Sequence, residues 1–334
     1  MSSLRVGIIG LGVGERHIAG YRSHPAAEVA VVCDTDPARL AEVVGRHPGI
    51  RGTADPDEVL EDATLGAVSI ASYDDFHHPQ IISALSRGKH VFVEKPVCLY
   101  EEEAADIRRH LRDRPGLRLS SNLILRLSPR FARLHERIRA GDLGELFYAE
   151  GDYVYGRLTK ITDGWRAQRP FYSVVLGGAV HMVDLLLWLT GDRVIEVTAY
   201  ANRIGAAGTA FRYPDLVAAL LRFESGLVGK VTANFASVHP HFHKVELYGT
   251  RATFVNDLGS ARFFDQRDPV REWKPVEDAY PGVDKGDMIF GFVDAITRGG
   301  DPLVTEDEVF DTMAVCFAIQ RSVETGQPER VRSL

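Results

Sequence analysis

The stretch that decides the fold is Arg5-Val6-Gly7-Ile8-Ile9-Gly10-Leu11-Gly12-Val13-Gly14-Glu15-Arg16-His17. Its apolar first half predicts a buried strand, and the glycines after it predict a tight turn into a helix. Small residues at such a turn let backbone N–H groups approach a pyrophosphate, whose charge the helix N-terminus favours. Gly10, Gly12, Val13 and Gly14 are therefore candidate cofactor-binding residues. The spacing is irregular, because Glu15 stands where the third glycine of G-x-G-x-x-G would come.

A second apolar run, Val29 to Cys33, ends in Asp34, 20 residues beyond Gly14. An acid at the tip of the second strand suits the ribose hydroxyls of NAD and repels the 2′-phosphate of NADP. We therefore expect NAD as the cofactor and disfavour NADP. Arg39 is the nearby residue that could bind a 2′-phosphate, and we expect the helix beginning at Pro37 to point it outward. The alternative is a glycine-rich turn that binds no ligand.

Composition limits the class of protein. A chain of 334 residues suggests two domains, and a net charge of −7 argues against nucleic acid as a partner. The three cysteines are far apart and form neither a metal-binding spacing nor a disulfide framework, which favours a reducing compartment. The longest apolar region, 174–189, is interrupted by His181 and Asp184, so it is no membrane span. We expect a cytoplasmic protein that binds neither nucleic acid nor membrane.

Strands and helices alternate over residues 1–121, which predicts an α/β domain with a parallel sheet covered on both faces. Asp36-Pro37 and Asp55-Pro56 each predict a helix start. Residues 122–334 follow another pattern, with strands mostly in series: 145–156, 193–204, 215–223, 227–236, 243–249 and 252–256. Such a series predicts an α+β domain with a largely antiparallel sheet. One helix, about 178–189, interrupts it, and two helices end the chain; Thr305 and Glu308 form a capping box for the last.

Apolar residues alternate on one face of the longest predicted strands: Val197, Ala199, Ala201, Val217, Ala219 and Leu221. A sheet face without helices needs a cover or must be polar. We therefore expect a homodimer or homotetramer that packs these sheets face to face.

Two residues are candidates for proton chemistry. Lys95 follows Glu94 at the carboxyl end of a predicted strand, where open α/β sheets place their ligands. His181 lies near a helix start after two glycines, and a neutral imidazole suits proton transfer near pH 7. The structural alternatives are an inert surface lysine, a core histidine, and an Asp184 paired with an arginine. We expect Glu94 to point away from Lys95, toward the backbone or the cofactor's ribose, because its charge would hold the lysine protonated.

The chain resembles the glucose–fructose oxidoreductase/inositol dehydrogenase (Gfo/Idh/MocA) family of NAD(P)-dependent oxidoreductases over nearly its full length. The most distinctive stretch is Gly88-Lys89-His90-Val91-Phe92-Val93-Glu94-Lys95-Pro96. The other matching segments are Gly10-Leu11-Gly12 near His17, Ile70-Ala71-Ser72 followed by His77, Arg126 before Ser128-Pro129, Gly141-Asp142-Leu143-Gly144, Gly164-Trp165-Arg166, and His181 to Trp188.

The resemblance implies a Rossmann domain, then a domain with an open, mostly antiparallel sheet, and a sugar, polyol or nucleotide sugar bound between them. Lys95 would exchange a proton with the carbinol oxygen as general acid/base, and His181 would hydrogen-bond the substrate near the reacting carbon. Ser72, His77, Glu94 and Lys95 join the expected cofactor contacts. Many members carry an Asp four residues before the histidine, where this chain has Gly177. Either Lys95 and His181 suffice, or Tyr172 or the substrate fills that role.

Further candidate substrate contacts are Asn122, Tyr153, Trp165, Arg166 and Tyr172, for which packing is the alternative interpretation. His239, His241 and His243 alternate along the chain, but Pro240 disrupts the strand and no acidic or thiol ligand accompanies them, so we expect no metal site.

The leading hypothesis is an NAD-dependent oxidoreductase that moves a hydride between a sugar or polyol hydroxyl and the nicotinamide. A second is a redox-assisted lyase or glycoside hydrolase that retains its NAD. A third is a non-catalytic, NAD- and sugar-binding regulatory protein, supported by Gly177 and opposed by Lys95 and His181.

Overall fold

The computed structural model describes residues 3–267 and 272–334, which form two compact units. The first unit comprises the chain up to Ile124, Val283–Asp311 and Leu334, and the second comprises Leu125–Gly282 and Thr312–Ser333. The first crossing between units falls near the expected boundary after residue 121. The expectation of one continuous second domain over 122–334 does not match this division, because Val283–Asp311 returns to the first unit.

The first unit is built on a six-stranded sheet in which every neighbouring pair is parallel, as the sequence predicted. The strands are β1 (Leu4–Ile9), β2 (Ala27–Cys33), β3 (Arg51–Thr53), β4 (Ala67–Ile70), β5 (His90–Val93) and β6 (Leu119–Ser121). They lie in the order β3-β2-β1-β4-β5-β6, so the order reverses between β1 and β4. An open parallel sheet binds ligands outside the carboxyl ends of its strands at such a point.

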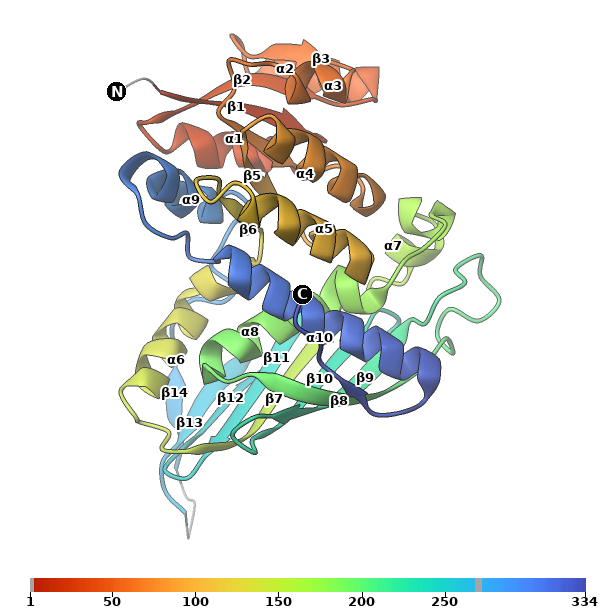
Figure 1. Ribbon diagram of the computed structural model, residues 1–334. Helices are drawn as coiled ribbons and strands as arrows, with labels where there is room; N and C mark the ends of the chain where they lie inside the picture. Colours follow the sequence, from red (N-terminus) through yellow and green to blue (C-terminus); the bar gives the residue numbers. More distant parts are fainter. Residues whose placement is uncertain (1–2, 268–271) are drawn as a thin grey trace. The chain divides into compact units, whose positions relative to one another are not determined.

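Local sequence signals mark the start of two helices of this unit. Its helices are α1 (Glu15–Arg22), α2 (Pro37–Arg46), α3 (Pro56–Leu60), α4 (His77–Ser86), α5 (Glu101–Arg112) and α9 (Asp287–Arg298), with a 3₁₀ turn at Asp74–Phe76. The side chain of Asp36 accepts from the Ala38 N–H at 2.9 Å, and that of Asp55 from the Asp57 N–H at 2.9 Å. Both predicted caps are therefore confirmed. Helix α1 packs beside α9, and α4 beside α5 (Figure 1).

The return of the chain to the first unit depends on a close approach of two glycines. A Cβ added to Gly20 in α1 would lie 2.4 Å from the carbonyl oxygen of Gly286, which precedes α9. The two helices therefore meet backbone against backbone, with no side chain between them at this point. The sequence predicted a helix here, but not where it packs, because an apolar stripe does not specify its partner.

The second unit is built on a nine-stranded sheet of order β14-β13-β12-β11-β7-β10-β9-β8-β15. Only the described pair β7 and β10 is parallel, and the other described pairs are antiparallel, as expected. The strands are β7 (Leu146–Val154), β8 (Val194–Asn202), β9 (Leu216–Phe223), β10 (Val228–Asn234), β11 (Phe242–Gly249), β12 (Thr253–Asp257), β13 (Ser260–Phe264), β14 (Lys274–Val276) and β15 (Glu329–Arg330). The sequence did not predict the last three, which are short.

Helices cover one face of this sheet (Figure 1). They are α6 (Pro129–Arg139), α8 (Val180–Thr190) and the later part of α10 (Glu306–Thr325), which begins in the first unit. Shorter elements are 3₁₀ turns at Ile124–Leu127 and Trp165–Gln168, α7 (Thr159–Thr162), and a π-helix at Val175–Ala179. Thr305 and Glu308 form the predicted capping box of α10, with Glu308 Oε2 accepting from the Thr305 N–H at 2.9 Å. Across 3–267 and 272–334, no helix is both long and apolar enough to cross a membrane.

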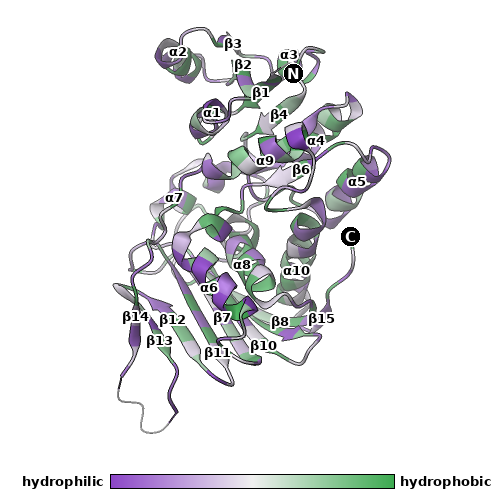
Figure 2. Ribbon diagram, turned by 90° about the vertical axis from the view of Figure 1, so that its left-hand side faces the viewer, coloured by the Kyte–Doolittle hydropathy of each residue, from purple (hydrophilic) through white to green (hydrophobic). Residues whose placement is uncertain are grey.

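Five of the six residues in the apolar row on β8 and β9 are buried inside their own unit, and Ala201 is partly buried. More and less buried residues alternate along β9 and β10. Along β10, hydrophobic and hydrophilic colours also alternate (Figure 2). Val197, Ala199 and Leu221 are at most 3% exposed. The Ala199 N–H donates to Ser322 Oγ of α10 at 2.9 Å, so this face already has its cover. The row therefore gives no reason for a partner chain, and our argument for an oligomer from these residues is wrong.

Candidate active site

The glycine turn after β1 combines two packed glycines with an open one. Gly10 has a φ of 86°, and a Cβ there would lie 2.4 Å from the carbonyl oxygen of Ala71 after β4. A Cβ at Gly14 would lie 2.2 Å from the Gly10 carbonyl oxygen. Gly12 is exposed, and a Cβ there would meet nothing within 4 Å. Gly10 and Gly14 therefore shape the turn, whereas Gly12 leaves its backbone open to a ligand.

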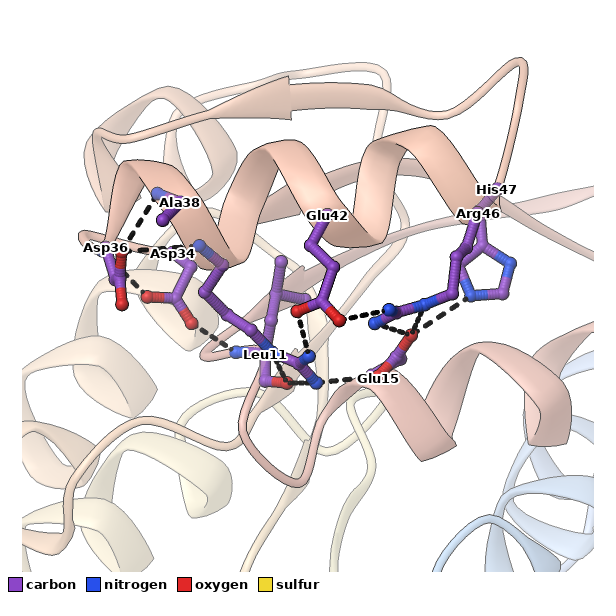
Figure 3. A network of polar contacts seen from close by, with 9 residues as sticks. Leu11, Glu15, Asp34, Asp36, Ala38, Glu42, Arg46 and His47 are labelled. Atoms are coloured by element: carbon purple, nitrogen blue, oxygen red, sulfur yellow. Dashed lines mark hydrogen bonds and ion pairs between the residues drawn. The ribbon is translucent and has the colours of Figure 1, made fainter.

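Asp34 lies beside this turn, as predicted. One of its carboxylate oxygens, Oδ2, accepts from the Leu11 N–H at 2.7 Å, and Oδ1 accepts from the Asp36 N–H at 2.9 Å. Figure 3 shows Asp34 and Leu11 next to each other below helix α2. The carboxylate thus stands at the carboxyl ends of β1 and β2, where a dinucleotide places its adenosine ribose.

Arg39 does not point outward, so that expectation is wrong. Its Nε and Nη2 donate to the carbonyl oxygen of Leu11 at 3.1 and 2.8 Å. Its Nη2 also donates to Glu15 Oε2 at 2.6 Å. The side chain folds back over the glycine turn because the turn and Glu15 both offer acceptors there.

The loops after β4 and β5 are tied together by His77. Its Nδ1 lies 2.7 Å from the carbonyl oxygen of Pro96, and its Nε2 lies 3.1 Å from that of Ser72. The ring is fully buried, and the Ser72 hydroxyl donates to Gln80 Oε1 at 2.7 Å. His77 therefore positions both loops from within, and its direct contact with a cofactor stays a prediction.

Glu94 is the centre of a buried polar network. Its Oε1 accepts from Asn122 Nδ2 at 2.6 Å and lies 3.3 Å from Nε2 of His17, whose Nδ1 lies 2.9 Å from Ser69 Oγ. Burial acts to raise the pKa of Glu94, but the positive charge of Lys285, the hydrogen bond with His17 and the charge of Lys95 hold this pKa far below its usual range. Glu94 is therefore a buried carboxylate that stays ionised. Its protein partners are the side chains of Asn122 and His17, not the backbone as one of our alternatives had it, and its contact with the cofactor's ribose stays a prediction.

Asn122 and Lys285 complete this network. The Asn122 side chain is fully buried and donates to the Lys285 carbonyl oxygen at 2.9 Å as well as to Glu94. The structure thus places Asn122 inside the first unit, while its proposed substrate contact is untested. Sequence reasoning gave no role to His17, Ser69 or Lys285. The position of His17 one turn after the glycines was a usable signal, whereas Lys285 offered none.

Lys95 follows this carboxylate directly and is partly exposed. It stands at the same edge of the sheet as the glycine turn and Asp34, because the carboxyl ends of parallel strands share one edge. The first unit therefore brings together an open backbone turn, the carboxylate of Asp34 and a partly exposed lysine.

In the second unit, a tyrosine hydroxyl fills the space beside Gly177. A Cβ at Gly177 would lie 2.1 Å from the Tyr172 hydroxyl oxygen, so residue 177 has no room for a side chain. Arg166 Nε donates to that hydroxyl at 3.0 Å, and the Trp165 ring meets the Tyr172 ring edge-on at 6.1 Å. Gly177 itself lies in the π-helix just before α8, a distortion that is frequent at functional sites.

Aromatic rings and histidines gather around His181. Tyr153 stacks with His181 at 6.0 Å, and the His243 ring lies 6.4 Å from the His181 ring. The rings of His241 and His243 are 4.9 Å apart, and His243 Nδ1 lies 2.7 Å from the Tyr280 hydroxyl oxygen. Within the described ranges, no group of three or more His, Cys, Asp or Glu side chains could hold a metal ion.

Asp184 belongs to the core of this unit. Arg126 donates to it from Nε at 3.1 Å and 3.2 Å and from Nη2 at 2.6 Å, and both side chains are 1% exposed. The structural interpretation of Asp184 as the partner of an arginine is therefore correct.

Two family models match the chain. Residues 4–121 match the oxidoreductase family with the NAD-binding Rossmann fold, and residues 131–255 match the GFO/IDH/MocA C-terminal domain. The two matches together span more than half of the chain. The chain belongs to the Gfo/Idh/MocA family of oxidoreductases.

Curated relatives and solved structures agree with this membership. An inositol 2-dehydrogenase of Leifsonia xyli is 30% identical over 328 residues, which are 96% of this chain and 92% of the relative. The scyllo-inositol 2-dehydrogenase (NAD(+)) of Bacillus subtilis is 27% identical over 336 residues, 97% and 95% of the two chains. A levoglucosan dehydrogenase in complex with NADH and levoglucosan superposes with a TM-score of 0.86 at 22% identity, covering 99% of this chain and 100% of that chain.

The first unit of this Gfo/Idh/MocA protein is an NAD-binding Rossmann domain, and the protein is an NAD-dependent oxidoreductase. The residues present fit the dinucleotide. Gly12 has open space where a pyrophosphate approaches the backbone, and Asp34 offers a carboxylate for the ribose hydroxyls.

Proposed function

We propose that this Gfo/Idh/MocA protein is a dehydrogenase that oxidises a hydroxyl group of a sugar or polyol with NAD. The observation that carries the proposal is Lys95, a partly exposed lysine at the sheet edge that also holds the glycine turn and Asp34. A proton-transfer group at that edge lies where the fold presents the reactive end of a bound dinucleotide.

The substrate class is inferred from relatives and from the second unit. The relatives named above act on inositols, and the solved neighbour binds levoglucosan. The second unit offers aromatic faces for the C–H faces of a sugar ring and an arginine and histidines for its hydroxyls. Tyr153, Trp165, Arg166, Tyr172 and His181 are the residues that we assign to this contact, with Asn122 in the first unit.

Bound NAD supplies the hydride acceptor, and the protein has to move one proton and hold one geometry. We assign the proton to Lys95 Nζ, which would take it from the substrate hydroxyl as the carbinol carbon gives up its hydride and becomes a carbonyl carbon. The negative charge of Glu94 favours the protonated form of Lys95. This effect is weakened because the carboxylate hydrogen-bonds with Asn122 and His17 and is also near the positive charge of Lys285. His181 orients the substrate oxygen.

Tyr172 takes the place of a side chain at residue 177. Its hydroxyl stands where that side chain would begin, and Arg166 holds it there. We therefore propose that the Arg166–Tyr172 pair does the orienting work for which many family members use an aspartate. Tyr172→Phe should lower kcat about tenfold or more with normal NAD binding, since one hydrogen bond to the substrate or to His181 is lost. Unchanged kcat and KM would remove Tyr172 from the site.

The central test has two steps. A thermal-shift screen of sugars and polyols with NAD identifies a substrate, and single-turnover NADH formation is then measured for Lys95→Met. We expect a rate about 10²- to 10⁴-fold lower, the usual share of a general acid/base, with NAD affinity nearly unchanged. Lys274→Met, at an exposed lysine of the second unit, is the control. A rate for Lys95→Met within tenfold of wild type would refute its role.

His181→Ala should cost about a hundredfold in the same assay. Product that accumulates without net NADH would instead identify a redox-assisted lyase or hydrolase. A protein that binds NAD and sugar but forms neither product would be a regulatory binding protein.

We also propose a homodimer or homotetramer, now on other grounds. Tyr200 and Leu220 are 76% and 56% exposed on β8 and β9, whose alternate residues are buried under helices. An exposed apolar pair on a broad sheet face favours association with a second copy. A monomer by light scattering at micromolar concentration would refute this.

A further inference from the structure

Leu11, between the first two glycines of the turn, is held from both sides. Asp34 accepts from its N–H at 2.7 Å, and Arg39 donates to its carbonyl oxygen at 2.8 and 3.1 Å. The carboxylate and the guanidinium therefore flank one residue. Arg39 is thus a cation held on the same residue of the turn that Asp34 contacts.

A guanidinium at this place is what a 2′-phosphate requires, because NADP enzymes use a nearby arginine for that phosphate. In this chain the guanidinium is already engaged. Its Nη2 donates to Glu15 Oε2 at 2.6 Å, and its Nη1 donates to Glu42 Oε2 at 2.8 Å. The Arg39 side chain thus donates hydrogen bonds to one backbone oxygen and two carboxylates.

Glu15 is held in turn by a second arginine. Arg46 Nε and Nη2 contact Glu15 Oε1 at 2.8 and 2.7 Å, and Arg46 Nη1 donates to Glu42. The four side chains form a ring of alternating charge, with Glu15, Glu42 and Arg46 visible beside Leu11 in Figure 3. The side chains of Glu15 and Arg39 are only 23% and 27% exposed, so their pair is the better shielded part of this ring.

We propose that Glu15 is a cofactor-selecting residue, which keeps Arg39 away from the 2′-position of the adenosine ribose and so excludes NADP. Asp34 repels a 2′-phosphate directly, whereas Glu15 removes the cation that would compensate for that repulsion. To bind NADP, the protein would have to break the ion pair between Arg39 and Glu15, while Glu15 would keep its ion pair with Arg46. The residue that interrupts the glycine pattern thereby acquires a function.

The test is direct binding of NAD and NADP by titration calorimetry, which needs no substrate. Glu15→Gln keeps the shape of the side chain and removes its charge. We expect the ratio of NADP to NAD affinity to rise about 10- to 100-fold, the range of one charge-assisted hydrogen bond. The ratio is the readout, because losing a negative charge near the pyrophosphate strengthens the binding of both dinucleotides.

Two further variants make the result specific. Glu61→Gln removes an equal charge from a surface pair with Arg87 in the same unit and should leave the ratio unchanged. Glu15→Gln combined with Arg39→Met should lose the gain in NADP affinity, because the released guanidinium is then absent.

An unchanged ratio in Glu15→Gln would overturn the inference, as would a gain that persists without Arg39. The inference rests on NAD binding by the first unit and not on the proposed substrate. If wild type bound neither dinucleotide, the cofactor assignment itself would be wrong and this inference would fall with it. Failure of the Lys95 test would leave it standing.

Discussion

Replacing Asp184 by Asn should destabilise the second unit severely. The carboxylate of Asp184 receives three hydrogen bonds from Arg126, and the two side chains are 1% exposed. Asn keeps the size of the side chain but removes the negative charge that faces the buried guanidinium. Breaking a buried pair in this way costs about 3 to 5 kcal/mol. For a unit of this size, each kcal/mol lowers the melting temperature by about 2 to 4 °C, so the expected loss is about 6 to 20 °C.

The chain contains its own reporter for this measurement. Its three tryptophans, Trp165, Trp188 and Trp273, all belong to the second unit, so their fluorescence follows the unfolding of that unit in urea. Trp188 lies in α8 with Asp184, and the Arg126 guanidinium is 5.8 Å from its ring.

A matched control is the pair of Arg137 and Asp142 in the same unit, at 2.9 Å with side chains 31% and 43% exposed. Asp142→Asn should cost no more than about 1 kcal/mol, because solvent screens exposed pairs. The double variant Arg126→Met, Asp184→Leu should recover most of the loss, since it removes both buried charges. If Asp184→Asn unfolded within 1 kcal/mol of wild type, the reasoning from burial would be refuted.

Four further predictions concern the first unit. Gly12→Ala should fold with an unchanged melting temperature but bind NAD at least about tenfold more weakly by calorimetry, because its Cβ meets no protein atom yet blocks the pyrophosphate. Gly10→Ala should also destabilise the fold by about 1 to 3 kcal/mol, through its positive φ and its contact with Ala71; equal melting temperatures for the two variants would contradict this. The pKa of Glu94 is lower in the folded unit than in the unfolded chain, where it is near 4.5, so the ionised carboxylate stabilises the fold fully above pH 4.5. This stabilisation is lost as the pH falls below 4.5 toward the lower folded pKa. Urea unfolding followed by circular dichroism should therefore depend less on acid pH in Glu94→Gln than in wild type. Gly20→Ala should cost about 1 to 3 kcal/mol by overpacking against Gly286, and a neutral effect would argue against the close approach of α1 and α9.

Features that depend on neighbours in sequence could be predicted. The caps at Asp36 and Asp55 connect residues two positions apart, and alternation of strands and helices sets a parallel sheet. That topology in turn put Asp34 and Lys95 at one edge of the sheet. The placement of a candidate site therefore followed from the order of elements, with no knowledge of distant contacts.

Features that depend on distant partners could not be predicted. Arg39 was expected to point outward, and only the fold shows that Glu15 and the Leu11 carbonyl oxygen lie within its reach. Glu94 finds Asn122 and the charge of Lys285, which lies far along the chain. A glycine such as Gly286 has no side chain to mark the helix it will meet. The direction of a side chain and the identity of its tertiary partner are set by such packing, and local sequence patterns do not predict them.

The division of the first unit into two separated segments has a consequence for its assembly during synthesis. About 160 residues of the second unit lie between Ile124 and Val283, and a ribosome needs roughly 8 to 30 s to add them. Throughout that interval Asn122 lacks the Lys285 carbonyl oxygen, and Gly20 has no α9 to pack against. The nucleotide-binding unit, whose synthesis begins first, is thus completed only after most of its neighbour has emerged. A fragment ending at residue 121 would retain the glycine turn and Asp34 yet never acquire the positive charge that Lys285 contributes near Glu94.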